Sequence, residues 1–353
     1  MKSGLSYFSQ IALFVFALLC VIQLPAKASD KLAIPIYFVT DRVLDTSSNS
    51  ELNYSDLQLA ERSLNYGIKN IVLVGKNIDS DVTERASGLG YWSPIDASST
   101  AAVANKTLSE SEFFDKLTET VNSDSKRPLI LFLHGCCQPY KASMETAARL
   151  EKAFESPVLL YSWCSIAPTD KLYRENEIRQ RNGAGVFYDF LNKLESRVPP
   201  EKIVIIAHSM GNRFVHEALK TRFWNRGSNK ECPRFRDVIF ACADVNVDDF
   251  ASDERDVAFS CNKLIITKND TDPALTLSQI QRGFYGRLGA PGWALKKLLS
   301  NGTGEIIDIT GFYRNSHDLP IPILVDLVRG EEGGYIQTNR FFQKKAHLVE
   351  VRR

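Results

Sequence analysis

The sequence predicts an α/β protein in which a mostly parallel β-sheet carries helices on both faces. Short apolar runs, several of them rich in β-branched residues, recur along the chain, and segments with helical periodicity lie between them. Most of these runs do not alternate with polar residues, which is typical of strands covered on both faces. Alternation of strands and helices favours parallel strands that are joined by helical crossovers.

Eight apolar runs are expected to be buried strands because of their length and composition. They are Ala33–Val39, Ile71–Val74, Leu129–Leu133, Val158–Tyr161, Ile203–Ala207, Val238–Cys242, Leu264–Thr267 and Ile306–Ile309. Apolar residues at helical spacing predict the helices. The spacing occurs within 113–121, 144–154, 187–194, 214–223 and 324–328.

Composition narrows the class of protein. The chain has 353 residues, of which 44% are hydrophobic and 24% charged, as in an ordinary globular protein. This excludes a wholly disordered, collagenous or coiled-coil chain. The formal net charge is +1, so no global basic field attracts nucleic acid, and we expect no nucleic-acid partner.

The first residues resemble a secretory signal peptide, which predicts an exported protein in the periplasm or outside the cell. Lys2 precedes an apolar run from Ile11 to Ile22, and the small residues Ala26 and Ala28 precede a cleavage point before Ser29. An uncleaved membrane anchor and a lipoprotein attached through Cys20 are the alternatives. Export permits disulfides among the six later cysteines, and the sequence alone does not choose their pairing.

Residues 29–330 are expected to form one domain, followed by a charged tail over 331–353. Polar stretches over 42–66 and 76–127 interrupt the alternation of strands and helices. Residues 281–304 contain several glycines and aromatic residues. This segment is either a lid loop or a plain surface insertion.

One motif carries most of the chemical information. The strand Ile203–Ile206 leads into Ala207-His208-Ser209-Met210-Gly211, and an amphipathic helix follows at once. A serine on such a strand–turn–helix junction is typical of a nucleophile whose hydroxyl is exposed above the sheet edge. We therefore predict that Ser209 is a nucleophile. The alternative is a serine that only caps an ordinary helix.

A second strand, Leu129–Leu133, ends in His134-Gly135-Cys136-Cys137. A glycine at this place lets the backbone turn toward a substrate carbonyl. We expect the backbone N–H groups of Cys136 and Met210 to stabilise an oxyanion, and His134 to be structural.

A nucleophilic serine needs a base and an acid that orients the base. Three histidines follow Ser209, of which His216 lies in the helix directly after the serine turn and only His317 and His347 come later. His317 lies between a predicted strand and a predicted helix. We predict that His317 is the base. Asp270, Asp272 and Asp244 are candidates for the acid, because each follows the end of a strand. Of Asp270 and Asp272, the one that is not the acid is expected to cap the helix that begins near Ala274. This chemistry requires no metal and no cofactor.

In order along the chain, these motifs resemble a bacterial branch of the α/β-hydrolase superfamily, whose esterase- or lipase-like members are poorly characterised. The resemblance is carried by Ile36–Arg42, Leu64–Gly67, His134-Gly135, Tyr161–Trp163, Ala207–Arg213, Asp272–Ser278, Asp308–Gly311 and His317. It implies the α/β-hydrolase fold and a Ser-Asp-His triad. It also ranks Asp272 first among the acids.

The chain departs from that family at Cys136-Cys137, where an aromatic residue and asparagine are usual. A disulfide from this pair to Cys164 is a candidate, because Cys164 also follows a strand at the same sheet edge. The leading hypothesis is a serine hydrolase acting on a small-molecule or lipid ester, thioester or amide, with ester first. The alternative is a catalytically idle fold that serves as a binding or scaffold module in the cell envelope. Contact with a membrane surface is a further hypothesis, and no obligate protein partner is implied.

Overall fold

The computed structural model describes residues 31–47, 52–59, 63–76, 91–95, 106–166, 172–226, 232–290, 304–330 and 348–349. The predicted signal peptide (1–28) lies outside the described residues, as does the predicted tail (331–353) except for 348–349. No helix within the described ranges combines the length and the apolar character that a bilayer-spanning segment needs.

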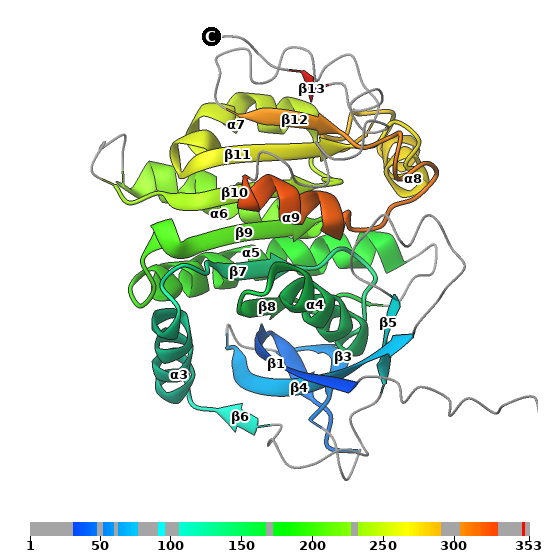
Figure 1. The fold of residues 1–353 in the computed structure, drawn as a ribbon. Helices are drawn as coiled ribbons and strands as arrows, with labels where there is room; N and C mark the ends of the chain where they lie inside the picture. Colours follow the sequence, from blue (N-terminus) through cyan, green and yellow to red (C-terminus); the bar gives the residue numbers. More distant parts are fainter. Residues whose placement is uncertain are drawn as a thin grey trace, which may run out of the picture.

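One twisted sheet forms the centre of the molecule (Figure 1). Its strands are β1 (Lys31–Thr40), β4 (Asn65–Lys76), β5 (Tyr91–Ile95), β6 (Lys106–Leu108), β7 (Leu129–Leu133), β8 (Val158–Ser162), β9 (Ile203–His208), β10 (Phe235–Ala241), β11 (Cys261–Lys268), β12 (Glu305–Asp308) and β13 (Leu348–Val349). Across the sheet they run in the order β13-β12-β11-β10-β9-β7-β8-β1-β4-β5, and β6 pairs with β4. Each of the eight predicted strands is present.

The strands from β12 to β1 are parallel to their neighbours, as the sequence predicts. Antiparallel pairs occur only toward the two ends of the described sheet, where β4 pairs with β1, β5 and β6, and β13 pairs with β12. The predicted strand 71–74 belongs to β4. The polar stretch 42–66, which leads into β4, contains a separate antiparallel pair, β2 (Arg42–Leu44) and β3 (Tyr54–Gln58).

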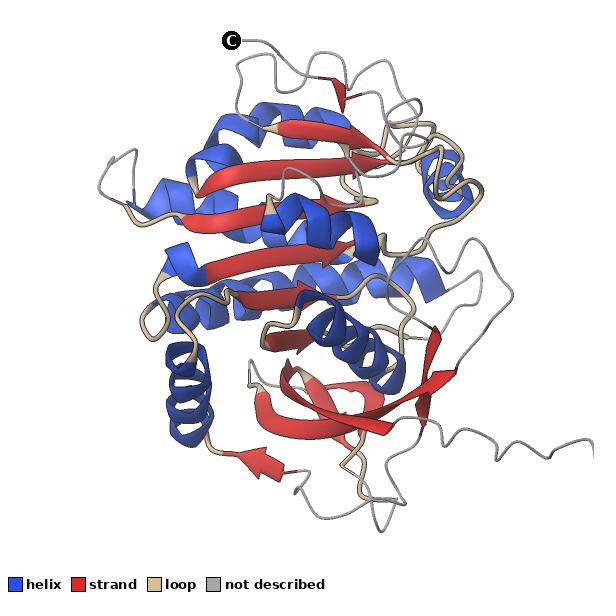
Figure 2. Cartoon of the chain, viewed as in Figure 1, coloured by secondary structure: helices blue, strands red, loops and turns tan. Residues whose placement is uncertain are grey.

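Helices cover both faces of the sheet (Figure 2). They are α3 (Glu110–Ser123), α4 (Tyr140–Phe154), α5 (Leu172–Glu195), α6 (Gly211–Arg226), α7 (Val247–Phe259), α8 (Pro273–Gln281) and α9 (Ile321–Arg329), with a short 3₁₀ turn at Pro200–Lys202. Buried side chains of α5, α6 and α7 join one hydrophobic core, together with those of α3. Side chains of α4 and α9 join a second core on the opposite face. Strands such as β7 are therefore buried along their whole length.

Parallel strands bring their carboxyl ends to one edge of the sheet, and this edge positions the predicted site. The loops after β7, β9, β11 and β12 carry Cys136, Ser209, Asp272 and His317, respectively. Helix α8 lies beyond this edge in Figure 1. Residues up to 181 positions apart in the sequence therefore meet in one place.

Candidate active site

Ser209 lies on the tight turn between β9 and α6. Its φ is 51°, a left-handed conformation that is strained for a residue with a side chain and that is typical of a nucleophile turn. The turn is also crowded. A Cβ on Gly211 would lie 2.5 Å from the carbonyl oxygen of His134, and one on Gly135 would lie 2.9 Å from Cβ of Ser209. Both positions therefore require glycine.

His317 contacts both of the predicted partners. Its Nε2 lies 2.8 Å from Oγ of Ser209, and its Nδ1 lies 2.6 Å from Oδ2 of Asp272. Asp272 is fully buried, and Ser209 is 6% exposed. In this arrangement Nδ1–H donates to the carboxylate, which leaves Nε2 free to accept the serine proton. The structure brings together the three residues that the sequence resemblance ranks first.

Asp272 also caps helix α8. Its Oδ1 accepts hydrogen bonds from the backbone N–H groups of Ala274 and Leu275, at 2.9 and 3.0 Å. The expectation that the capping aspartate differs from the one beside the histidine is therefore wrong, because the two oxygens of one carboxylate divide these contacts. Asp270 instead pairs with Lys268 at 2.8 Å on the surface.

Asp244 has a different environment, in a buried polar cluster. It accepts a hydrogen bond from Tyr173, one from Ser278 at 2.7 Å and one from Arg213 at 2.8 Å. Arg287 Nε lies 3.3 Å away. Burial and the charge of Asp244 raise the pKa of Tyr173 to about 12, so the phenol stays protonated and donates. Asp244 therefore stabilises the pocket wall through these hydrogen bonds, whereas Asp272 contacts His317.

Asn269 joins the loop that carries the aspartate to the loop that carries the histidine. Its side-chain amide donates to the carbonyl oxygens of Tyr313 and Ser316, both at 2.7 Å. The side chain is fully buried. These two bonds fix the loop before His317 against the turn before Asp272. Sequence reasoning missed this residue, whose only signal is an asparagine at the end of a buried strand.

His208, next to the serine, supports the base through its backbone. Its Nε2 donates to the carbonyl oxygen of His317 at 2.9 Å. Burial and the neighbouring His317 lower the pKa of His208 to about 3, so its ring is neutral at physiological pH. The structure shows a buried ring that holds the loop of His317.

His134 is buried between two strand ends and does not contact Ser209 through its ring. Its ring nitrogens lie 2.8 Å from the carbonyl oxygen of Gly135 and 3.2 Å from that of Trp163. The indole of Trp163 donates to the carbonyl oxygen of His134 at 2.8 Å. Burial and the nearby charge of Arg42 lower the pKa of His134 to about 3. These contacts fit the structural role expected for it.

The two predicted oxyanion donors come from the loops after β7 and β9, which pack together at Gly135 and Ser209. Cys136 follows β7, and Met210 directly precedes α6, where unpaired helical N–H groups favour negative charge. Neither backbone N–H donates a hydrogen bond to any residue that the structure describes. The N–H of Ser209 donates to the carbonyl oxygen of Ala241, and the carbonyl of Ser209 accepts from the N–H of Asp244. These bonds hold the turn and leave the N–H groups of Cys136 and Met210 available to a substrate oxygen.

Cys136 and Cys137 form a disulfide with each other. The predicted disulfide to Cys164 is therefore wrong. Cys164 is a free, buried thiol whose Sγ accepts a hydrogen bond from Arg179 at 2.9 Å. Cys242 is also free and buried. The sequence gave no reason to prefer a bridge between these two cysteines, because a disulfide between adjacent residues closes no loop of the chain.

A pocket of about 350 Å³ opens at Ser209 and His317. Its wall is mainly apolar and includes Cys136, Cys137, Tyr173, Ala274, Leu275, Leu277 and Gln281. In the predicted lid segment, Leu288–Ala290 are buried and their backbone bonds to Val245, Ala243 and Asn269. Residues 291–303 lie outside the described residues, so the lid remains a hypothesis. Across the described ranges, no cluster of three or more His, Cys, Asp or Glu is arranged to hold a metal ion.

Comparison with known proteins identifies the family. A search of curated proteins finds no match. A family model described as "Alpha/beta hydrolase of unknown function (DUF900)" matches residues 109–320, which is more than half of the chain. The matched segment contains β7 to β12 and every residue of the predicted site. The chain therefore belongs to this family of α/β-hydrolases of unknown function.

Proposed function

We propose that the protein is a serine hydrolase that cleaves carboxylic esters, with Ser209 as nucleophile, His317 as base and Asp272 as the acid that orients the base. The observation that carries this proposal is the position of His317, which lies within hydrogen-bond distance of both other side chains. Membership of an α/β-hydrolase family supports hydrolysis in general. Thioesters and amides are alternative substrates for the same chemistry.

The reaction follows from this geometry. Oγ of Ser209 attacks the carbonyl carbon while its proton passes to Nε2 of His317. The imidazolium then gives that proton to the leaving alcohol, and the acyl group stays on the serine. A water molecule then attacks the acyl-enzyme. His317 takes a proton from this water and returns it to Oγ of Ser209 as the acid product leaves. Asp272 keeps Nδ1 protonated and stabilises the imidazolium.

Two backbone donors would stabilise the charge that develops on the substrate oxygen. Cys136 and Met210 supply N–H groups without partners among the described residues. Each such donor contributes on the order of 3 kcal/mol to lowering the barrier. The pocket is walled mainly by apolar side chains, which supports an ester with an apolar acyl or alkyl group.

Contact with a lipid surface is part of the proposal. Large apolar side chains are exposed in and just after α8, at Leu277, Ile280, Phe284 and Tyr285, and Leu277 also lines the pocket. Co-sedimentation with phospholipid vesicles tests this. Binding should fall when Ile280 and Phe284 are replaced by serine, and equal binding of this variant would contradict it.

We also propose that the chain is exported. The N-terminal pattern supports export, and disulfides persist mainly in oxidising compartments. Cell fractionation with N-terminal sequencing is the test. A mature protein that begins at Ser29 outside the cytoplasm is expected, and an uncleaved cytoplasmic chain would contradict export.

Hydrolysis of p-nitrophenyl esters of increasing acyl length tests the main proposal. The wild type should release p-nitrophenol, and Ser209→Ala and His317→Ala should reduce kcat by at least about 10³-fold. His347→Ala is the matched histidine control and should retain wild-type activity. A folded wild type that hydrolyses no ester, thioester or amide would contradict the proposal and would favour the binding or scaffold module.

A further inference from the structure

The Cys136–Cys137 disulfide lies in the wall of the pocket that contains Ser209. We propose that this disulfide is a positioning element for the oxyanion site, and that its reduction by a dithiol strongly lowers turnover. The inference rests on the proposed function, because it assigns the disulfide to the loop that would hold the substrate oxygen. It concerns the same site but adds a redox requirement.

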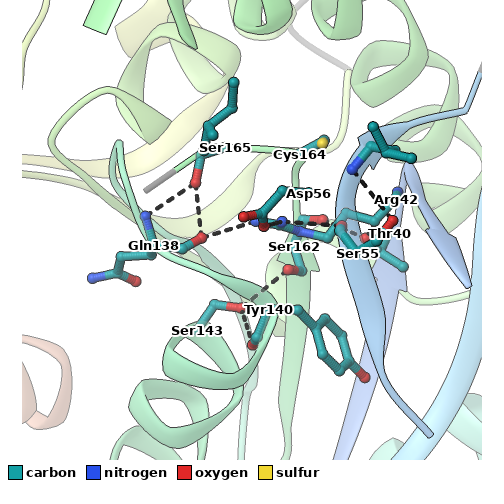
Figure 3. A network of polar contacts seen from close by, with 12 residues as sticks. Thr40, Arg42, Ser55, Asp56, Gln138, Tyr140, Ser143, Ser162, Cys164 and Ser165 are labelled. Carbon is teal, nitrogen blue, oxygen red and sulfur yellow. Dashed lines mark hydrogen bonds and ion pairs between the residues drawn. The ribbon is translucent and has the colours of Figure 1, made fainter. Parts of the chain in front are cut away.

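The loop that carries the disulfide is anchored firmly on its carboxyl side (Figure 3). Arg42, which is fully buried, donates to the carbonyl oxygen of Gln138 at 2.8 Å. Ser165 donates to the same carbonyl at 2.8 Å and accepts from the N–H of Gln138 at 3.1 Å. Arg42 is itself held by Asp56 at 2.9 Å. The position of Gln138 is therefore fixed by three bonds from two other strand ends.

The loop is equally fixed before the disulfide. His134 lies between the carbonyl oxygens of Gly135 and Trp163, and Trp163 donates back to it. Gly135 packs against Ser209 so closely that a Cβ on it would lie 2.9 Å from Cβ of the serine. A shift of the loop at this point changes the distance between the nucleophile and the neighbouring N–H of Cys136.

The two cysteines between these anchors have no backbone anchor of their own. No backbone N–H or carbonyl of Cys136 or Cys137 hydrogen-bonds to another residue in the part of the chain that the structure describes. Cys137 has a φ of 69°, a left-handed conformation that a non-glycine residue keeps only under constraint. The constraints that the structure shows are the disulfide and a contact from Asn176, whose amide lies 3.6 Å from Sγ of Cys137.

The disulfide is accessible to a reductant at the pocket. Cys136 and Cys137 are partly exposed and line the pocket. The free thiols of Cys164, Cys242 and Cys261 are buried, and burial raises their pKa values to about 11, 12 and 12. Such thiols react slowly at neutral pH. Mild redox treatment therefore acts on the pocket and leaves the core thiols unchanged.

The redox step is a thiol–disulfide exchange. A dithiol thiolate attacks one sulfur of the bridge, the Cys136–Cys137 bond breaks, and a mixed disulfide forms. The second thiol of the reductant then closes on the first. Two electrons and two protons pass to the protein as two thiols, and the reductant leaves as a cyclic disulfide. Cys137 is then free to leave its left-handed conformation, and the N–H of Cys136 loses its fixed position.

Loss of one oxyanion donor lowers kcat on the order of 10²-fold with little change in KM, because the interaction forms mainly in the transition state. The test compares ester hydrolysis by the oxidised protein, by the same sample reduced with dithiothreitol, and by that sample after reoxidation. Thiol titration and mass spectrometry monitor the bridge. Cys232→Ser is the control, because it removes a partly exposed free thiol and leaves the disulfide unchanged.

The expected result is a reversible fall in kcat of at least about 30-fold for the wild type and for Cys232→Ser. Cys136→Ser/Cys137→Ser, folded by circular dichroism, should have the low kcat and no response to dithiothreitol. A kcat that changes less than twofold on reduction, or an active protein without the disulfide, would overturn the inference while the proposed function stands. An oxidised protein without hydrolase activity would reject the proposed function, and this inference with it.

Discussion

Replacing Asp272 with asparagine separates the two contacts that its carboxylate makes. Oδ1 caps α8 through the N–H groups of Ala274 and Leu275, and Oδ2 accepts from His317. An asparagine can keep its carbonyl oxygen on the cap. Its NH₂ group then faces Nδ1 of His317 and donates to it. The imidazole is forced into the tautomer that carries its proton on Nε2, so it no longer accepts the proton of Ser209.

The magnitudes for the two contacts differ greatly. The wrong tautomer should reduce kcat on the order of 10⁴-fold, which corresponds to about 5 kcal/mol in the barrier. The free energy of unfolding should fall by only about 1–3 kcal/mol, because one charge-assisted hydrogen bond is lost while the helix cap stays. Asp272→Ala should lose a further ~1 kcal/mol of stability, because the cap is then absent as well.

The assay pairs steady-state ester hydrolysis with urea denaturation for both variants. Asp270→Asn is the matched control, because the Asp270 side chain pairs with Lys268 on the surface and does not contact His317. It should retain wild-type kcat and change stability by less than about 1 kcal/mol. The reasoning is refuted if Asp272→Asn keeps kcat within tenfold of wild type, or if Asp270→Asn loses activity comparably.

Three further predictions concern residues around the site. Arg42→Met should lower the free energy of unfolding by about 3 kcal/mol in urea titrations, because a fully buried guanidinium loses its charge-assisted hydrogen bonds. Asp56→Asn changes the exposed partner of this ion pair and should lower the free energy of unfolding by less than half as much. Gly211→Ala should cost about 1–3 kcal/mol and also reduce kcat, because the new methyl overlaps the His134 carbonyl; an unchanged kcat would contradict the crowding argument. The free energy of unfolding should be highest above pH 6.5 and fall toward pH 3. In that range the unfolded chain protonates His134 and His208, while burial keeps both rings neutral in the folded state. In urea titrations, His208→Gln should show a smaller fall in the free energy of unfolding across the same range.

Much of the fold could be predicted because its strands are covered on both faces. Runs such as Leu129–Leu133 and Ile203–Ala207 are continuous and apolar, and the structure buries every residue in them. Helix α7 was missed because few of its residues are apolar and buried, among them Val247, Phe250 and Val257. A helix with so sparse a stripe has little periodic signal in the sequence.

The site was predictable where local sequence constrains it. Ser209 stands in a strand–turn–helix motif, and beyond the helix of that motif the sequence contains only two histidines, His317 and His347. The acid depended on the turn after β11, where Asp270 and Asp272 are two residues apart and only the folded loop decides which faces His317. That loop is fixed by Asn269, through bonds to a segment more than 40 residues later. Such long-range bonds leave no pattern in a single sequence.

The pairing of Cys136 with Cys137 was not predictable for a related reason. Six cysteines after the predicted signal peptide allow many pairings, and the choice depends on which sulfur atoms the fold brings together. Cys164 follows a strand at the same edge, but its sulfur faces Arg179 on α5. Strand order alone therefore suggested the wrong partner.

The most direct test of the central claim is labelling of the purified protein with a fluorophosphonate, followed by peptide mapping. An activated serine attacks phosphorus, fluoride leaves, and a stable phosphonyl ester forms on Oγ. The account predicts a single label on Ser209, absent in Ser209→Ala and strongly reduced in His317→Ala, with His347→Ala labelled as the wild type is. A folded wild-type protein that is not labelled, or is labelled at another residue, would contradict it.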